Sequence, residues 1–373
     1  MIAAFRHDRR TGHLRRLLIA WMVVSGPEAT AQTRKPARDT DRAERVNTLF
    51  AEFARMTGPG AAVAVACGDS IVFARGYGFA DVEHGVAITP ATSFRLASLT
   101  KQFTAAAILT LVEQRRLSLD DRLGDVLPGT PGYARDVRVR HLLAHTSGVP
   151  DYEPLAGPED GEPQLHDRDV LALLHGARAL HFVPGTSWRY SNSGYALLAL
   201  IIEHASGERF ADYLRRHVFD PAGMGHAVAH QDGVDTVPNR AYGYSSRQGQ
   251  WVRTDQNRTS AVLGDGGIYA SVEELVRWSA ALDRNTVVTP QSFALATTPV
   301  ALASGAHTGY GFGWFLDAMN GHRRQRHEGD SIGFRTAIQR YPDDGLTVIV
   351  LVNRGAAPID ALSDGVARIY LAP

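Results

Sequence analysis

Residues 94–101 read Phe-Arg-Leu-Ala-Ser-Leu-Thr-Lys, and an apolar run from Phe103 to Leu111 follows directly. This pattern predicts a helix from about Ser98 to Leu111, with Ser98 and Lys101 one turn apart on the same face. A serine becomes a nucleophile when a neighbour takes its proton, which a partly desolvated lysine can do. If Ser98 opens the helix, its backbone N–H points outward and can bind an oxyanion. The alternative is an ordinary helix start with a solvated lysine.

The cation content singles out the same lysine. Of the 39 Lys and Arg residues in the 373-residue chain, only Lys35 and Lys101 are lysines. Arginine serves wherever only charge matters, so a retained lysine is expected where arginine fails, above all in losing a proton. Lys101 is therefore the candidate partner of Ser98.

Composition excludes several classes of protein. The 39 acidic residues balance the cations, which argues against nucleic-acid binding, and 44% hydrophobic residues argue against disorder. The single cysteine, Cys67, excludes an internal disulfide framework and a CxxC zinc site. Because Cys67 follows an apolar run, we expect it to be buried. No metal or other cofactor is predicted.

The first residues are typical of an export signal. Five arginines within residues 6–16 precede the apolar run Leu17–Val24, and Ala29-Thr30-Ala31 fits a cleavage site. We predict a signal peptide over residues 1–31 and a periplasmic or secreted protein, by either the general or the twin-arginine route. The alternative is an uncleaved amphipathic tail. No other segment is long and apolar enough to cross a membrane, so no stable membrane span is expected after cleavage.

Strand patterns occur early and late in the chain, with helices between them. Residues 33–40 are polar and expected to be mobile, and an amphipathic helix is predicted from Asp41. The remaining predicted strands are 61–67, 71–77, 310–316, 323–327, 334–341 and 346–353, and the remaining predicted helices are 138–145, 167–177, 193–205, 209–218, 271–282 and 359–369.

This order predicts an α+β fold for residues 32–373. The early and late strands would form one antiparallel sheet flanked by the terminal helices, giving an α/β lobe of about 41–118 and 265–373. Residues 119–264 would form an inserted, mainly helical lobe. We expect the site between the two lobes.

Four later segments complete an ordered set with residues 94–101. They are Leu-Leu-Ala-His-Thr-Ser-Gly at 142–148, Tyr-Ser-Asn at 190–192, Gly-Gly-Ile-Tyr at 266–269 and His-Glu-Gly at 327–329. From about Phe50 to Asn353 the sequence resembles the serine β-lactamase-like superfamily, closest to class C β-lactamases and their penicillin-binding and family VIII-type esterase relatives. The resemblance implies a β-lactamase/transpeptidase-like fold.

The resemblance also implies catalytic roles. Ser98 would attack a carbonyl group and form an acyl-enzyme. Lys101 and Tyr190 would share the proton, either through a tyrosinate favoured by the lysine charge or with Lys101 itself as the base. Asn192 would orient Lys101 and the substrate.

The implied oxyanion hole consists of the backbone N–H groups of Ser98 and Asp330, the second following Gly329. His327 stands where the third motif of the superfamily often has lysine. A histidine with an ordinary pKa near 6.5 is mostly neutral at pH 7 and gives little fixed positive charge. β-Lactams and D-Ala-terminated peptides carry a carboxylate that such a charge would hold.

We therefore predict a secreted serine hydrolase of esters, or of amides and D-amino-acid peptides. Its partner would be a small molecule or peptide, and no nucleic acid. The alternatives are a β-lactamase with true turnover, in which Arg335 or Arg323 holds the carboxylate, and a non-catalytic penicillin-binding sensor of cell-wall fragments.

Two other motifs are rejected and two loops are left open. Residues 329–333 match G-x-S-x-G, but a strand rather than a helix is predicted after Ser331. His226 and His230 lack the glutamate of H-E-x-x-H and are expected in a loop without metal. Residues 142–149 are predicted to be a structural turn. Loops 150–166 and 228–262, which would shape the acyl pocket, show no readable pattern.

Overall fold

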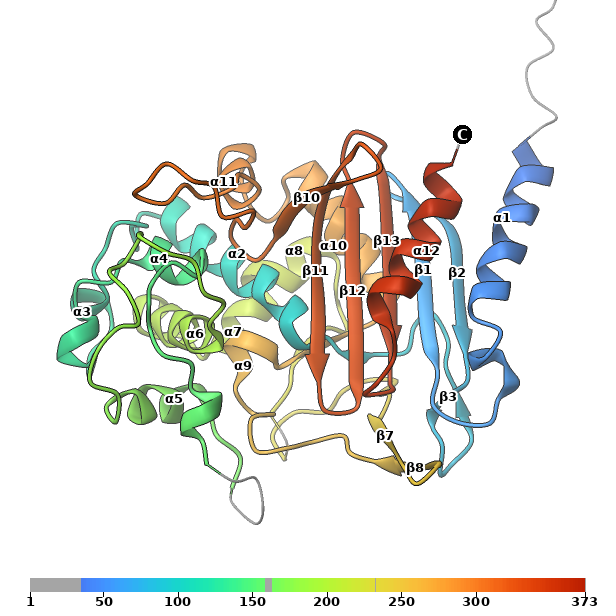
Figure 1. The fold of residues 1–373 in the computed structure, drawn as a ribbon, viewed down its shortest axis with the longest axis horizontal. Coiled ribbons are helices and arrows are strands. Elements are labelled where there is room, and N and C mark those ends of the chain that lie inside the picture. Colours follow the sequence, from blue (N-terminus) through green and yellow to red (C-terminus); the bar gives the residue numbers. More distant parts are fainter. Residues whose placement is uncertain (1–34, 158–162, 232, 373) are drawn as a thin grey trace, which may run out of the picture.

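A six-stranded antiparallel sheet joins the two ends of the chain (Figure 1). The computed structural model describes residues 35–157, 163–231 and 233–372. The strand order is β10-β11-β12-β13-β1-β2. Its strands are β1 (Ala61–Cys67), β2 (Ser70–Tyr77), β10 (Phe315–Met319), β11 (His322–Ser331), β12 (Phe334–Tyr341) and β13 (Leu346–Val352). The predicted α+β fold is confirmed, whereas the predicted signal peptide, residues 1–31, lies outside the described residues and stays a prediction.

Helices cover both faces of the sheet. Helices α1 (Lys35–Leu49) and α12 (Ile359–Leu371) lie side by side on one face, and α10 (Val272–Arg284) lies on the other (Figure 1). Side chains alternate between the faces of a strand, so Val63 of β1 joins the core under α1 and α12 while Ala64 joins the core under α10. Both faces of the central strands are therefore buried, which explains their continuous apolar sequence.

Most of the remaining helices pack beside the sheet, on the left of Figure 1, whereas α8 lies against α10. The remaining helices are α2 (Thr100–Glu113), α3 (Leu123–Val126), α4 (Val139–Leu143), α5 (Asp167–Leu174), α6 (Asn192–Ser206), α7 (Phe210–Leu214), α8 (Asp220–Ala222), α9 (Leu263–Gly266) and α11 (Pro290–Ala296). Helix α2 is buried along nearly its whole length and contacts α6 and α9. The 3₁₀ turn before it, Ala97–Leu99, contacts β11 and β12, so this segment links the sheet to the helical part of the molecule.

Short strands hold the loops in place. They are β3 (Phe79–Asp81), β4 (Val86–Ala87), β5 (Phe94–Arg95), β6 (Val228–Ala229), β7 (Tyr244–Arg247), β8 (Gln250–Arg253) and β9 (Ile268–Ala270). Strand β9 pairs with both β5 and β6, which brings the segment after α9 against the segment that leads to Ser98. Three of these strands lie in the 228–262 region, where the sequence showed no pattern.

Several local predictions are wrong for physical reasons. Helix α1 begins at Lys35, not Asp41, and Pro36 in its first turn is compatible with that start. The strand predicted from Tyr310 begins only at Phe315, because two glycines interrupt it and Gly313, with φ of 79°, passes against the backbone of α2. Cys67 is exposed rather than buried, since it ends β1 at a hairpin turn.

Two predicted helices also differ at their ends. The predicted helix 138–145 is the shorter α4, and the predicted helix 209–218 stops at Leu214 and continues as a π turn over Arg215–Phe219. The turn precedes Pro221, which has no N–H to continue an α-helix. The predicted helix 271–282 is present as α10, and it begins with a capping box in which Ser271 Oγ accepts the Glu274 N–H at 3.2 Å.

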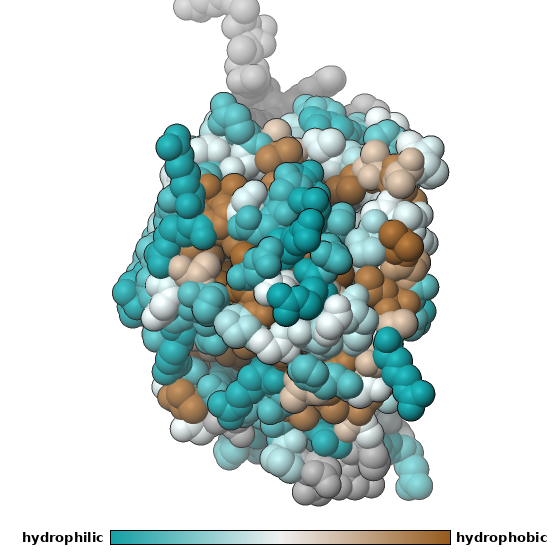
Figure 2. Space-filling model, turned by 90° about the vertical axis from the view of Figure 1, so that its left-hand side faces the viewer, coloured by the Kyte–Doolittle hydropathy of each residue, from teal (hydrophilic) through white to brown (hydrophobic). Residues whose placement is uncertain are grey.

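The surface on the helical side is mixed. Hydrophobic side chains lie there in patches between hydrophilic ones (Figure 2). Across the ranges that the structure describes, no helix combines the length and apolar character needed to cross a bilayer.

Asn353 at the end of β13 ties three segments together. It is fully buried, its Oδ1 accepts the Gly60 N–H at 2.6 Å, and its Nδ2 donates to the carbonyls of Phe79 and Tyr242 at 3.1 and 2.8 Å. These bonds satisfy backbone groups that cannot reach water.

Asn353→Ala should lower the free energy of unfolding by roughly 3 kcal/mol or more, because it leaves several buried polar groups without partners. Urea denaturation measures this change. Val86→Ala, at a side chain that is 52% exposed, is the control and should change stability little. Equal stability of the two variants would contradict the assigned role of Asn353.

Candidate active site

Ser98 is the accessible point of a buried segment. Between Thr92 and Leu111 it is the only residue that is not buried. It lies in a 3₁₀ turn, Ala97–Leu99, directly before α2, so the predicted position at the helix start is nearly correct. Ala97 has φ of 49°, a left-handed backbone that a non-glycine residue adopts only where its surroundings enforce it. The fold thus holds Ser98 in a fixed, strained turn at a surface.

Lys101 lies beneath Ser98 with no exposed surface. Its Nζ donates to Ser98 Oγ at 3.1 Å, Asn192 Oδ1 at 2.8 Å and the Asp265 carbonyl at 2.9 Å. Three acceptors match the three hydrogens of an ammonium group. In a neutral amine, the serine hydroxyl would instead donate to the nitrogen lone pair. Both states keep the serine oxygen within hydrogen-bond distance of Lys101 Nζ.

Tyr190 completes a triangle with these two residues. Lys101 Nζ lies 4.9 Å from the centre of its ring. Its hydroxyl is buried, and no hydrogen-bond partner for it occurs among the described residues. Burial raises its pKa, while the Lys101 charge acts to lower it. A buried hydroxyl without a partner is costly, so this one is available to a substrate or to the serine proton.

Asn192 links Lys101 to two carboxylates that the sequence analysis missed. It is the first residue of α6, and its backbone N–H donates to Asp151 Oδ2 at 3.1 Å. Its Nδ2 donates to Glu153 Oε1 at 3.0 Å. Both carboxylates come from loop 150–166, which showed no sequence pattern that could have identified them.

Gly329 brings β11 against the Ser98 turn. A Cβ atom on Gly329 would lie 2.3 Å from the Leu96 carbonyl oxygen and 2.2 Å from Thr336 Oγ1. Only glycine fits there, so this glycine is required for the close approach. Asp330 follows, and it lines two cavities together with Ser98. The two predicted oxyanion donors thus belong to adjoining segments, while their role stays a prediction.

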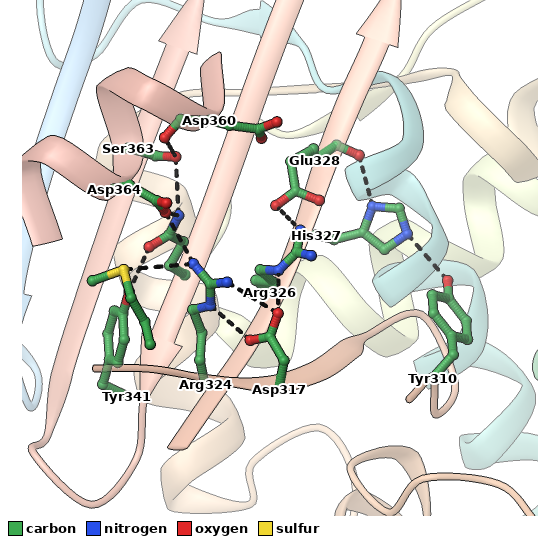
Figure 3. Close-up of polar contacts among 12 residues, drawn as sticks. Tyr310, Asp317, Arg324, Arg326, His327, Glu328, Tyr341, Asp360, Ser363 and Asp364 are labelled. Carbon is green, nitrogen blue, oxygen red and sulfur yellow. Dashed lines mark hydrogen bonds and ion pairs between the residues drawn. The ribbon is translucent and has the colours of Figure 1, made fainter. Parts of the chain in front are cut away.

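His327 is locked in a neutral form. Its Nδ1 contacts the Glu328 carbonyl at 2.7 Å and its Nε2 contacts the Tyr310 hydroxyl at 3.1 Å (Figure 3). A carbonyl only accepts, so Nδ1 carries the hydrogen and Nε2 accepts from Tyr310. Burial, helped by the Lys101 charge, lowers the pKa of His327 to about 3. The third motif therefore offers no positive charge.

The two arginines considered as replacements are engaged elsewhere. Arg335 forms an ion pair with Asp330 at 2.6 Å and donates to the Ser331 carbonyl at 3.0 Å. Arg323 pairs with Asp343 near the opposite end of β11. Neither presents an unpaired guanidinium to Ser98.

Two cavities meet at Ser98 and Asp330. The larger, of about 680 Å³, is lined by Tyr190 and His327 and by an apolar wall that includes Phe315, Pro358 and Ile359. The smaller, of about 110 Å³, is lined by polar residues that include Glu153, Asn192 and Thr259. A substrate with its carbonyl at Ser98 can place one part in each cavity.

The rejected motifs do not form the sites that they resemble, although Ser331 lines the smaller cavity. A turn and strand β12 follow Ser331, so it is not on a nucleophile elbow. His230 contacts Arg240, and the backbone N–H of His226 donates to Glu274. The described part of the chain contains no cluster of three or more His, Cys, Asp or Glu side chains that could hold a metal.

The buried His327 predicts a pH dependence of stability. Its folded pKa of about 3 lies below the ordinary value of 6.5, so the unfolded chain binds a proton that the folded chain does not. The stability that the neutral His327 gives to the folded state is complete above pH 6.5 and is lost as the pH falls toward 3. Between these pH values the free energy of unfolding falls by up to about 1.4 kcal/mol per pH unit.

His327→Gln removes this titration but leaves an acceptor for Tyr310. The difference in unfolding free energy between the original protein and the variant should therefore shrink as the pH falls from 7 to 4, measured by denaturant titration. His307→Gln, at an exposed position, is the control. Parallel stability curves for the original and His327→Gln proteins would refute the neutral state of His327.

Known proteins share this fold and sequence. The Beta-lactamase family model matches residues 47–370. Penicillin-binding protein 4* of Bacillus subtilis is 32% identical over 84% of this chain and 72% of its own length. A D-aminopeptidase of Gluconobacter oxydans is 30% identical over 82% of this chain, which spans only 57% of that enzyme.

A solved penicillin-binding protein of Bacillus halodurans superimposes with a TM-score of 0.75 and 28% identity, over 87% of this chain and 98% of its own. These matches confirm the predicted resemblance and the prediction of a serine hydrolase. The chain belongs to the Beta-lactamase family.

Proposed function

We propose that this protein hydrolyses amide bonds next to a free amino group, in D-aminoacyl amides or short D-aminoacyl peptides, through an acyl-enzyme on Ser98. The observation that carries the proposal is the charge at the site. The third motif, in which a lysine would be positive, is neutral here, whereas the Glu153 carboxylate lines the smaller cavity together with the serine. The D-aminopeptidase relative supports the D configuration.

Glu153 is suited to bind a substrate ammonium group. It is exposed on the rim of the smaller cavity, and within the described ranges no basic side chain lies within 4 Å of its carboxylate. Although the residue is exposed, the atoms packed around its carboxylate partly desolvate it, and this desolvation and the nearby Asp151 charge raise its pKa. An arriving cation would relieve that repulsion and form a charge-assisted hydrogen bond. The same site would repel a substrate carboxylate.

The position of Tyr190 assigns the two halves of the substrate. The leaving amine needs a proton, and Tyr190 lines the larger cavity with Ser98. The leaving group therefore occupies the larger cavity, and the aminoacyl group occupies the smaller one near Glu153. The volumes of about 680 and 110 Å³ favour a small aminoacyl side chain and a bulky, apolar leaving group.

The reaction follows from these positions. Ser98 Oγ bonds to the carbonyl carbon as its proton passes to the Lys101–Tyr190 pair, and the N–H groups of Ser98 and Asp330 stabilise the oxyanion. The C–N bond then breaks, and the amine leaves with the proton from Tyr190. Water then attacks the ester carbon as one of its protons passes to the pair, and the pair gives that proton to Ser98 Oγ when the C–O bond breaks and the acid leaves.

Ester hydrolysis uses the same steps, so esters without a carboxylate are also expected substrates. β-Lactams and D-Ala-terminated peptides lack a partner for their carboxylate, because His327 is neutral and Arg335 is paired. We place true β-lactam turnover and a non-catalytic sensor of cell-wall fragments second. The sensor would form an acyl-enzyme that persists.

Ser98→Ala should lower hydrolysis of D-alanine p-nitroanilide by at least about 1,000-fold and abolish labelling by a fluorophosphonate. Release of p-nitroaniline and intact-protein mass spectrometry measure the two effects. Ser304→Ala, at an exposed serine that lines neither cavity, is the control and should keep most activity. Persisting label in Ser98→Ala would disprove the nucleophile, and an acyl adduct that outlasts substrate would support the sensor.

Glu153→Gln should raise KM for D-alanine p-nitroanilide about tenfold, since it removes the charge but keeps an acceptor for Asn192. Hydrolysis of p-nitrophenyl acetate, which has no ammonium group, should be unchanged. Asp360→Asn, in the larger cavity, is the control carboxylate. A larger KM effect from Asp360→Asn would place the ammonium group on the other side of Ser98.

A further inference from the structure

His145 holds the backbone on both sides of Tyr190. Its carbonyl oxygen accepts the Arg189 N–H at 3.0 Å, and its ring Nδ1 accepts the Ser191 N–H at 3.2 Å. Its ring also faces the Tyr190 ring, with centroids 4.2 Å apart and planes 34° apart. One residue therefore contacts the residue before Tyr190, the residue after it and its side chain.

These contacts matter because the other end of Tyr190 is only loosely held. Its hydroxyl makes no hydrogen bond of good geometry to any residue that the structure describes, although the polar groups of Lys101 and Ser98 lie near enough to act on its pKa. Its ring position is therefore set by its own backbone and by the side chains packed against it. His145 contacts the backbone on both sides of Tyr190 and also packs against its ring.

The backbone of His145 has a left-handed conformation that is uncommon for a residue with a side chain. Helix α4 ends in a Schellman turn, in which the Thr146 N–H bonds to the His141 carbonyl and the His145 N–H to the Leu142 carbonyl. The residue in the left-handed position of such a turn is usually glycine. His145 occupies it with φ of 57°, despite the cost to a residue with a side chain. The turn alone gives no reason for a histidine.

The protonation state of His145 fits a positioning role. Because Nδ1 accepts from Ser191, the hydrogen of the neutral ring is on Nε2. Nε2 is buried without a hydrogen-bond partner in the described structure, inside a cluster that includes Tyr195, Tyr310 and Trp188. Burial, and then the Lys101 charge, lower the pKa of His145 well below its usual value. The ring stays neutral and keeps its Nδ1 lone pair for Ser191.

We propose that His145 is a positioning residue that fixes Tyr190 over Ser98 and Lys101. The segment 142–149 is then more than the structural turn that the sequence predicts. The inference needs only that Ser98 is acylated with the help of Tyr190, so it does not depend on which amide or ester is cleaved.

Two pairs of variants test the proposal. The Oδ1 of asparagine can occupy the place of Nδ1, whereas the amide of glutamine reaches the place of Nε2. His145→Asn should therefore retain kcat within about tenfold and His145→Gln should lose about 100-fold, with KM little changed in both, because a 1 Å misplacement of a reacting group costs about that much. His230→Asn, at another buried histidine, controls for the loss of a ring.

The second pair separates positioning from stability. Glycine suits a φ of 57° and alanine does not, so His145→Gly should have a higher Tm than His145→Ala. Both lack the ring, so Ser98 in both should be phosphonylated equally slowly by a fluorophosphonate, with loss of fluoride, followed to completion by mass spectrometry. Phosphonylation rates that rise with Tm, or equal rates for the Asn and Gln variants, would overturn the proposal. A wild-type protein that reacts with the fluorophosphonate but does not cleave D-alanine p-nitroanilide would contradict the proposed substrate alone.

Discussion

A lysine with no exposed surface holds the site together. A buried ammonium group must have partners, because an unpaired charge in the interior is very costly. Lys101 meets this need with one oxygen from its own segment, one from the start of α6 and one from the end of α9. Three segments far apart in the sequence must therefore meet at one nitrogen. The arginines that fill almost every other cationic position could not do this and still exchange a proton.

The groups around Lys101 Nζ differ in charge. His145 and His327 are both neutral, so Lys101 is the cation at the centre of the site. The carboxylates of Asp151 and Glu153 stand on the far side of Asn192. A polar substrate would lie between the buried cation and the exposed carboxylate, and their charges would orient it. A site that binds anions would not have a carboxylate in this position.

The sequence predicts what depends on spacing and pattern. The apolar strands predicted at 61–67 and 346–353 and the positions of Ser98 and Lys101 on one turn depend on local sequence, and they appear in the structure. The ends of elements fail where tertiary contacts decide, as at Gly313 against α2. Glu153 could not be predicted, since its importance comes from Asn192, which is distant in the chain. The second role of the turn at His145 was hidden for the same reason.

The pairing of β1 with β13 has a consequence for folding. Ala61 is opposite Val352, so the centre of the sheet joins residues from nearly opposite ends of the described chain. Such non-local pairing forms slowly, and it cannot begin until β13 has been synthesised. Ser98 and Lys101 are made well before Gly329 and Asp330 on β11. A chain that ends before β11 would therefore contain the proposed nucleophile but neither Gly329 nor the proposed oxyanion donor Asp330. On this proposal, hydrolysis requires a chain that extends through β11.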